Sequence, residues 1–418
     1  MVSPIAFFTT AQIAGLSLTS VQELSTTDIK DLKATQVGAF TVTQLDVFSA
    51  TLLGALSGTQ VKGLTTTQIG ALRGDQFVFN AAQLSVLNSP QIAALTTTEI
   101  EALTATQLAA LSAAQIGALE TTDVAALTST SITLLSSTQL KALTATQITA
   151  LTATQVASLT ASQLGGLSQT QIGAFETTDI ASLTTTQVAG LGSAQIKGLK
   201  STHVAALTST QIEALTSSQI TALSNVQITA LSTTQIQALV DTQLGALTTA
   251  QIGGLETTDI AALTTTQASV LSTTLLRALS ATQVKALSTT QIGSLSATQV
   301  GAFEVADLAA LSPTTIASLT ETQLDGLTVT QVKGLTATQV VALSTTQVAS
   351  LSTSQIKGLT AAQVKALATS QVEALTETQI AVLNTTQFME LEAADIAGLS
   401  STQLGAISTT QIKGDRKS

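Results

Sequence analysis

The chain has 418 residues, of which 44% are hydrophobic and 10% are charged, and its formal net charge is −10. This apolar composition excludes a disordered chain, and an acidic chain without basic clusters is a poor binder of nucleic acid. Without cysteine there are no disulfides or thiolate metal sites, and because Ser, Thr and Gln interrupt every apolar run we expect no membrane insertion.

Residues 1–8, with the sequence MVSPIAFF, precede the first repeat. They include no basic residue and only a short apolar stretch, so they lack the pattern of a Sec signal peptide. We therefore expect any export of the protein to use another route.

From Thr9 onward the sequence is an array of octapeptides with the consensus [S/T]-x-[T/S/A]-Q-[I/V/L]-x-[A/G/S]-L. We number the positions of each octad from one, the Ser or Thr, to eight, the Leu. The array holds 51 octads, and one residue is missing once, in Arg73–Phe79 (RGDQFVF). The sequence thus predicts an N-terminal segment of residues 1–8, a single continuous repeat region of residues 9–414 and a polar tail of residues 415–418.

Each octad carries the signature of a helix start. Ser or Thr followed three residues later by Gln forms a capping box, in which each side chain bonds the backbone N–H of the other residue. The Leu before the cap and the Ile or Val after the Gln form a hydrophobic staple. Pro313 directly follows the cap Ser312, and Pro90 stands one place further along its octad, where the missing N–H is harmless.

One continuous helix does not fit this period. Eight residues turn through about 800°, so the Leu of successive octads would drift around a straight helix. We predict short helices of roughly six or seven residues, which are stable only when stacked on neighbouring octads, and hence an all-α solenoid. The alternative is a β-solenoid built from the Thr-rich stretches, although Leu and Ile would then lie on opposite faces of a strand.

Five octads replace both cap residues by acids. We interpret these acids first as groups that complement the helix dipole and alternatively as carboxylate ligands of calcium, which would be the only cofactor. The residues of these pairs are Glu120, Asp123, Glu176, Asp179, Glu256, Asp259, Glu304, Asp307, Glu392 and Asp395.

Other distinctive residues are interpreted structurally. His203, the single histidine, replaces a Gln at position four. The tripeptide Arg73-Gly74-Asp75 is explained by the break in the repeat, and Phe40, Phe48, Phe175 and Phe303 replace the core Leu at position eight. Position six tolerates both Lys and Glu, which is typical of a solvated face. No pattern of catalytic residues appears, so we expect the protein not to be an enzyme.

The ends of the array are as apolar as its interior. Uncapped solenoid ends that match the interior can stack head to tail into a fibre. We therefore expect self-association near Phe7, Phe8 and Ile412.

The opening Leu-Thr-x-x-Gln-Val, as in LTATQV at residues 151–156, resembles the helix opening of TAL-effector-type repeats. The base-reading loop of those repeats is absent here, so DNA binding is not expected. The whole chain resembles the repetitive, Thr- and Ser-rich, acidic surface proteins of bacteria, such as adhesin stalks and S-layer or filament subunits. That resemblance implies a secreted or cell-surface location and self-assembly or contact with other surface proteins.

We therefore expect a structural repeat protein that forms a rod, filament or lattice at a bacterial cell surface. The alternative function belongs to the β-solenoid, whose Thr arrays would bind an ordered surface such as ice or polysaccharide.

Overall fold

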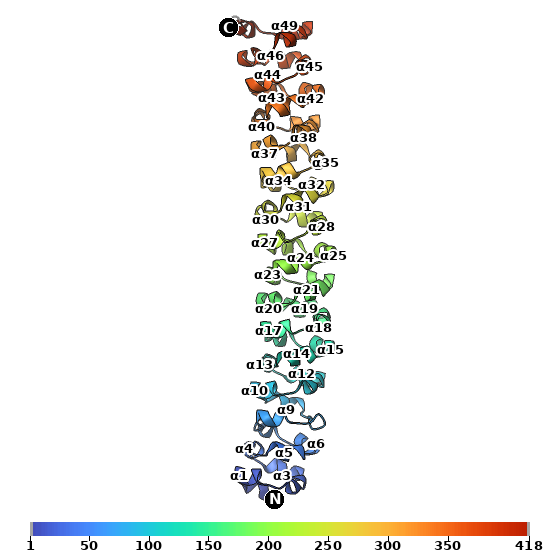
Figure 1. Ribbon diagram of the computed structural model, residues 1–418, viewed down its shortest axis with the longest axis vertical. Coiled ribbons are helices and arrows are strands. Elements are labelled where there is room, and N and C mark those ends of the chain that lie inside the picture. The colour runs from blue at the N-terminus through green and yellow to red at the C-terminus, as the bar shows by residue number, and fades with distance from the viewer. Residues whose placement is uncertain (1–2, 416–418) are drawn as a thin grey trace. The chain divides into compact units, whose positions relative to one another are not determined.

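The computed structural model describes residues 3–415, and the side chains of residues 3–412. Within residues 3–415 a short 3₁₀ helix, η1 (Pro4–Phe7), is followed by 50 α-helices, from α1 (Thr10–Ala14) to α50 (Thr409–Asp415), and no strand occurs (Figure 1). Each helix begins at position two of its octad, and all except α50 end at position five, six or seven. The prediction of an all-α repeat fold is confirmed, and the alternative prediction of a β-solenoid fold is wrong.

The capping box starts the helices as the sequence predicts. At α17 (Ala145–Thr149), Gln147 N–H donates to Thr144 Oγ1 over 3.2 Å, and Thr144 N–H donates to Gln147 Oε1 over 2.7 Å. Pro90 and Pro313 lie in the first turns of α10 (Ser89–Ala93) and α38 (Pro313–Ala317). The helices are nevertheless shorter than expected, because most have only five or six residues.

Two extended residues separate helices such as α18 (Ala153–Ser158) and α19 (Ala161–Gly165). Leu159 has φ −59° and ψ 137°, and the cap Thr160 has φ −72° and ψ 155°. No residue with positive φ is found within the described range. The helices therefore end because the Leu and the next cap are extended, without a left-handed glycine turn.

The Gln at position four has a second bonding partner that the sequence did not reveal. Gln155 Nε2 donates to the carbonyls of Val124 (2.9 Å) and Leu127 (2.5 Å), which belong to the octad four units earlier. The same bonds, with sequence separations of 31 and 28 residues, recur along the chain. We call this repeated set of Gln-to-carbonyl bonds the amide ladder. It ties each coil of the solenoid to the next.

Helices also pack on helices three octads away. For example, α13 (Ala113–Ile116) packs on α16 (Ser137–Lys141), and α15 (Ser129–Leu134) packs on α18. Because an octad contacts the third octad along through its helix and the fourth through the amide ladder, one turn holds between three and four octads.

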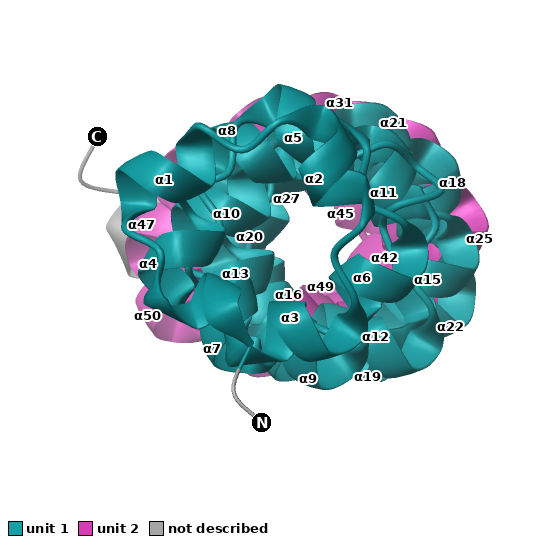
Figure 2. Ribbon diagram, turned by 90° about the horizontal axis from the view of Figure 1, so that it is seen from below, with its two compact units in different colours: residues 1–207 teal, residues 208–418 magenta. Residues whose placement is uncertain are grey.

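The chain divides into two compact units, residues 1–207 and 208–418. Seen from below, the helices of the first unit form a ring around a common axis, in which α2 (Leu18–Gln22) and α5 (Val42–Asp46) lie together on one side and α13 lies elsewhere on the ring (Figure 2). The second unit contains α25 (Ser209–Glu213) to α50 and repeats the same bonding pattern.

The core consists of positions five and eight. In a typical octad Ile148 is 0% and Leu151 is 4% exposed, and Phe40, Phe48 and Phe175 are buried at position eight as predicted, as is Phe303. Burying one such side chain contributes roughly 1.5–3 kcal/mol. Short helices that would unfold in isolation are therefore held by the stacking of coils.

The seven-residue unit Arg73–Phe79 forms a turn instead of a helix. The amide ladder continues across it, because Gln83 Nε2 donates to the carbonyls of Gly54 and Leu56, the same octad positions that other glutamines reach. The Arg73 guanidinium bonds both Asp46 and Asp75. The ion pairs of Arg73 thus link the Arg-Gly-Asp tripeptide to Asp46 at the one irregular unit of the repeat.

The N-terminal segment fills the place of an octad, although it lacks the consensus. Ile5 is buried like a position-five residue. Gln36 Nε2 donates to the carbonyls of Ile5 (3.3 Å) and Phe8 (2.8 Å), with the usual separations of 31 and 28 residues. Residues 3–8 therefore belong structurally to the first coil.

Some coils approach so closely that only glycine fits between them. A Cβ atom added at Gly198, the last residue of α23 (Ser193–Gly198), would lie 2.6 Å from the backbone oxygen and 2.8 Å from the Cα of Gln169. Gly198 thus allows contact between two backbones from coils three octads apart.

We predict that Gly198→Ala lowers the free energy of unfolding by about 1–3 kcal/mol, because two backbones must separate. Gly293→Ala, at the end of α35 (Thr289–Gly293), is the matched control, since nothing lies within 4 Å of its added Cβ. That control should gain up to about 1 kcal/mol from helix propensity. Chemical denaturation of both variants tests the prediction, and equal effects would contradict it.

Candidate functional site

The chemically distinctive side chains lie where position four departs from glutamine. His203 keeps an N–H donor at this position, whereas Asp123, Asp179 and Glu99 place acidic side chains there. All four are buried, with exposures of 1–2%. Position four therefore makes both the cap bond and the ladder bonds of the octad, and it is also where the chain buries titratable groups.

In the acidic octads only the aspartate takes part in the capping box. Glu120 N–H donates to Asp123 Oδ2 over 3.0 Å, and Glu176 N–H donates to Asp179 Oδ2 over 2.9 Å. The glutamate carboxyl of each pair is exposed and makes no side-chain cap bond. The pairs at Glu256, Glu304 and Glu392 repeat this arrangement. Of the two acids in each pair, only the aspartate therefore acts in the cap.

Burial raises the pKa of the Asp123, Asp179, Asp259 and Asp307 carboxyls above the ordinary value, and the neighbouring glutamate raises it further. The bond from the cap N–H opposes this shift, because it stabilises the carboxylate. An aspartate side chain is also shorter than a glutamine and carries no N–H, so these octads contribute no ladder bond.

The structure keeps the acidic pairs separate from one another. Within the described residues, no group of three or more His, Asp or Glu side chains is placed to hold a metal ion. A calcium ion at Glu120 and Asp123, or at any of the other pairs, would need ligands from outside the pair. Calcium binding remains a prediction from the sequence.

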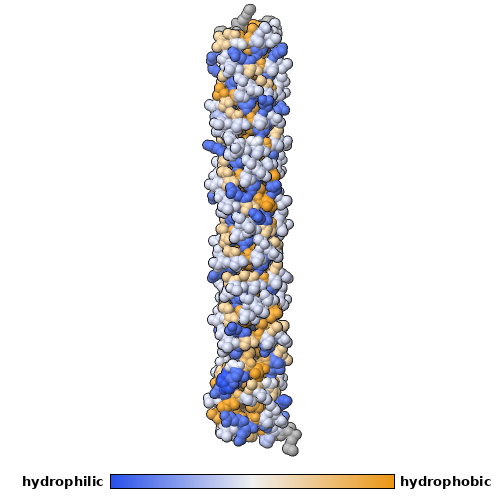
Figure 3. Space-filling view, turned by 90° about the vertical axis from the view of Figure 1, so that its right-hand side faces the viewer, coloured by the Kyte–Doolittle hydropathy of each residue, from blue (hydrophilic) through white to orange (hydrophobic). Residues whose placement is uncertain are grey.

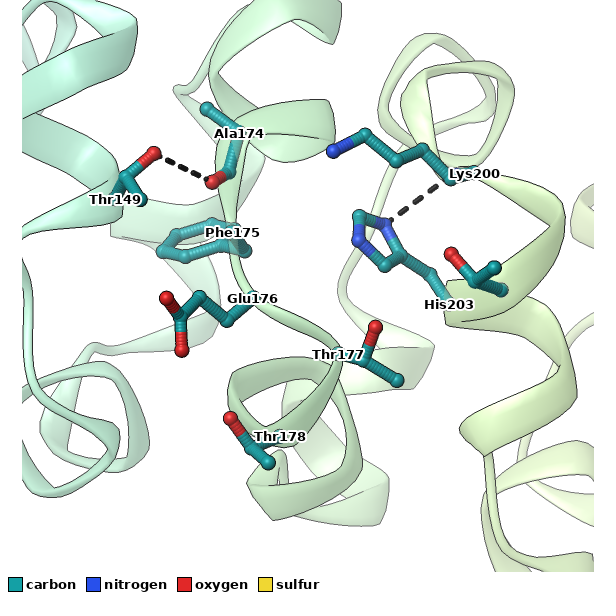
Figure 4. Close-up of a pocket in the computed structure, with 9 residues that line it drawn as sticks. Thr149, Ala174, Phe175, Glu176, Thr177, Thr178, Lys200 and His203 are labelled. Atoms are coloured by element: carbon teal, nitrogen blue, oxygen red, sulfur yellow. Dashed lines mark hydrogen bonds between the residues drawn. The ribbon is translucent and has the colours of Figure 1, made fainter.

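His203 occupies the position-four place in α24 (Ser201–Ala206) and reproduces the cap bond of glutamine, as predicted. Its Nδ1 accepts from Lys200 N–H over 3.2 Å (Figure 4). The Phe175 backbone, at the usual ladder separation of 28 residues, acts to raise the pKa of His203, but burial outweighs it. The bond from Lys200 N–H to Nδ1 requires a neutral imidazole with the proton on Nε2. Burial and the Lys200 charge lower the pKa of His203 and so favour that neutral form.

A surface cavity of about 510 Å³ lies beside His203 in the first unit. It is lined by Thr149, Glu176 and Lys200 among other residues, and Thr149 Oγ1 donates across a coil boundary to the Ala174 carbonyl over 2.9 Å (Figure 4). His203 Nδ1 accepts the cap bond from Lys200 N–H, and Nε2 carries the proton of the neutral ring, so the ring cannot act as a general base without breaking its cap. The cavity therefore presents hydroxyls and two opposite charges without a nucleophile–base pair.

The residues predicted at the ends of the array are exposed to different degrees. Phe7 is 79% exposed and Ile412 is 46% exposed, while Phe8 is half-buried. None of the helices in residues 3–415 combines the length and the apolar character that a membrane span requires.

Short stacked helices, a fixed octad period and the amide ladder define the class of the protein as an α-solenoid of octapeptide repeats. The profile of one family, the ALTTAQ repeat, matches residues 116–153, 172–209, 197–225, 225–257, 276–305, 300–337 and 337–369. These ranges cover more than half of the chain, which therefore belongs to the ALTTAQ repeat family. The six letters run from position seven to position four and occur unchanged at residues 246–251. No curated protein matches the chain.

We predict that Asp259→Gln raises the free energy of unfolding by about 1–2 kcal/mol. The new amide can reach the carbonyls of Ile228 and Leu231 at the ladder separations, and a buried charge is removed. Asp259→Asn is the control, because it removes the charge but its side chain is too short to reach these carbonyls. Thermal melts with and without chelator provide the measurement. A variant that is less stable than the wild type only when calcium is present would instead support calcium binding.

Acid should weaken the coil that contains His203. Because the pKa of His203 lies below its ordinary value of 6.5, the unfolded chain binds a proton that the folded chain does not. Stability is therefore expected to fall as the pH drops below about 6.5, by at most about 1.4 kcal/mol per pH unit. Hydrogen exchange of residues 172–207 between pH 7.5 and 5.5 measures this loss. His203→Gln should abolish it, and an unchanged acid loss in that variant would contradict the assignment.

Proposed function

We propose that the protein is a structural element that forms a rod, filament or lattice at a bacterial cell surface. The observation that supports this proposal is the amide ladder. It uses the glutamine side chain of position four in octad after octad, at the same separations of 31 and 28 residues. A sequence organised in this way specifies the number of coils, and therefore length, more than it specifies any one site.

The outward surface fits a structural role. The face in Figure 3 is mostly pale, with hydrophilic (blue) and hydrophobic (orange) residues interspersed along it. Positions two and three expose Ala, Ser and Thr in most octads, and position six exposes Lys141, Lys285 and Glu373 among others. Such a weakly charged hydroxyl surface favours contacts between copies or with other surface proteins over binding to nucleic acid.

The proposed partner is another copy of the chain. Phe7 is the most exposed of the large apolar side chains in the described residues, and Ile412 is also exposed. A contact between the Phe7 region of one copy and the Ile412 region of another would be heterologous, so it would not close and would grow into a fibre.

Self-association should depend on these residues. We expect light scattering of the wild type to show masses that increase with concentration, and electron micrographs to show fibres. Phe7→Glu combined with Ile412→Glu should reduce the assemblies at least tenfold, because two charges would then be buried at the contact. Val226→Glu is the control, since Val226 is 68% exposed but lies in the middle of the array. A wild type that remains monomeric would contradict end-to-end assembly.

The surface location has a separate test. Antibodies against the folded protein should label intact bacterial cells of the source without permeabilisation. Labelling only after permeabilisation would contradict the proposed location while leaving the assembly proposal standing.

A further inference from the structure

The amide ladder has one position at which an acid could replace the amide without changing its shape. In the octads just before it, Gln91 Nε2 donates to the carbonyls of Lys62 (3.1 Å) and Leu64 (2.6 Å). The Gln91 Oε1 atom accepts from Asn88 N–H over 2.9 Å. One end of the glutamine thus accepts a bond within its own octad, and the other end donates to the octad four units earlier.

Glu99, in α11 (Thr97–Glu101), stands at the same position and makes only the first half of these bonds. Its Oε2 accepts from Thr96 N–H (2.7 Å) and from Thr96 Oγ1 (2.9 Å). Its Oε1 takes the place of the glutamine amide nitrogen. Among the described residues, Oε1 is the only buried side-chain nitrogen or oxygen without a hydrogen-bond partner, and Glu99 is 2% exposed.

The register identifies the groups that this oxygen faces. Gln83 and Gln91 reach carbonyls 29 and 27 residues earlier, across the seven-residue unit. The same separations from Glu99 lead to Gly70 and Leu72, which are main-chain acceptors. A carboxylate oxygen opposite carbonyl oxygens is repelled, whereas a carboxylic acid O–H can donate to them.

We propose that Glu99 is a proton-dependent member of the amide ladder. When protonated at Oε1, its carboxyl donates to the Gly70 or Leu72 carbonyl as a glutamine amide would. When deprotonated, it breaks the ladder between these two coils. The proton comes from solvent during local opening and returns to solvent in the same way, so no other reactant is required.

The electrostatic surroundings favour the protonated form. Burial raises the pKa of Glu99, the bonds from Thr96 lower it, and the Asp123 charge raises it. Asp123 lies in α14 (Thr121–Ala126), which packs on α11, and Glu120 is the N-cap residue just before α14. Glu101 is the other charged side chain of α11 itself, and residues 65–72 of the preceding coil carry no charge. No cation on these elements offsets the carboxylate.

The direction of the pH effect follows from the raised pKa. Above the ordinary value of 4.5 the unfolded chain releases the proton that the folded chain keeps. The equilibrium constant for local opening should therefore rise with pH, by up to about tenfold per unit, until the pKa of the folded state is passed. This direction is opposite to that expected for His203.

The test compares three proteins at pH 4.5 to 8. Carbon-13 NMR of labelled glutamate follows the Glu99 carboxyl, and hydrogen exchange follows opening of residues 66–103. In the wild type we expect a titration above the ordinary range and opening that increases with pH. Glu99→Gln restores the consensus and should remove the pH dependence. The control Glu101→Gln, an exposed change on the same helix, should leave it intact.

A reciprocal variant tests whether the mechanism is transferable. Gln115 donates to the carbonyls of Leu84 (2.8 Å) and Leu87 (2.9 Å). Gln115→Glu should create the same pH-dependent opening around residues 84–119. The proposal is overturned if Glu99 titrates at or below its ordinary pKa. Equal pH dependence of opening in the wild type and in Glu99→Gln would also overturn it.

Discussion

The fold depends on one side chain that bonds in two directions. The Gln at position four accepts from its own cap N–H and donates to carbonyls in the coil before it, as Gln155 does with Thr152, Val124 and Leu127. A buried amide left half-paired would cost about 1–3 kcal/mol. The start of each helix and the stacking of coils are therefore coupled. The same Gln side chain that caps its own helix also bonds the neighbouring coil.

Substitutions at this position alter stability in predictable directions. His203 keeps the cap bond as a neutral ring, Asp123 keeps the cap bond but makes no ladder bond, and Glu99 makes the ladder bond only when it carries a proton. The histidine coil is expected to weaken in acid and the Glu99 coil in base. Stability along an otherwise uniform array thus differs from coil to coil, as in other solenoids whose repeats contribute separately.

The sequence predicted what is encoded within one octad. The cap at Thr144 and Gln147 and the burial of Ile148 and Leu151 arise among neighbouring residues, so the pattern reveals them. The number of octads per turn depends on partners 28 to 31 residues away, which near-identical units cannot indicate. The acidic pairs were visible because two positions changed together. Glu99 was missed because its cap Thr96 is ordinary, and only its unpartnered oxygen distinguishes it.

The seven-residue unit shows how the array can change during evolution. Gln83 bonds Gly54 and Leu56 across the missing residue, so bonding follows the order of octads and not the residue count. Because each octad bonds the fourth octad before it, insertion of one octad gives only the next few octads a new partner of the same kind, and octads further along keep theirs. Unequal recombination can therefore lengthen or shorten the array by single octads. Pairs such as Gly198 with Gln169 mark the junctions where such an exchange would be selected against.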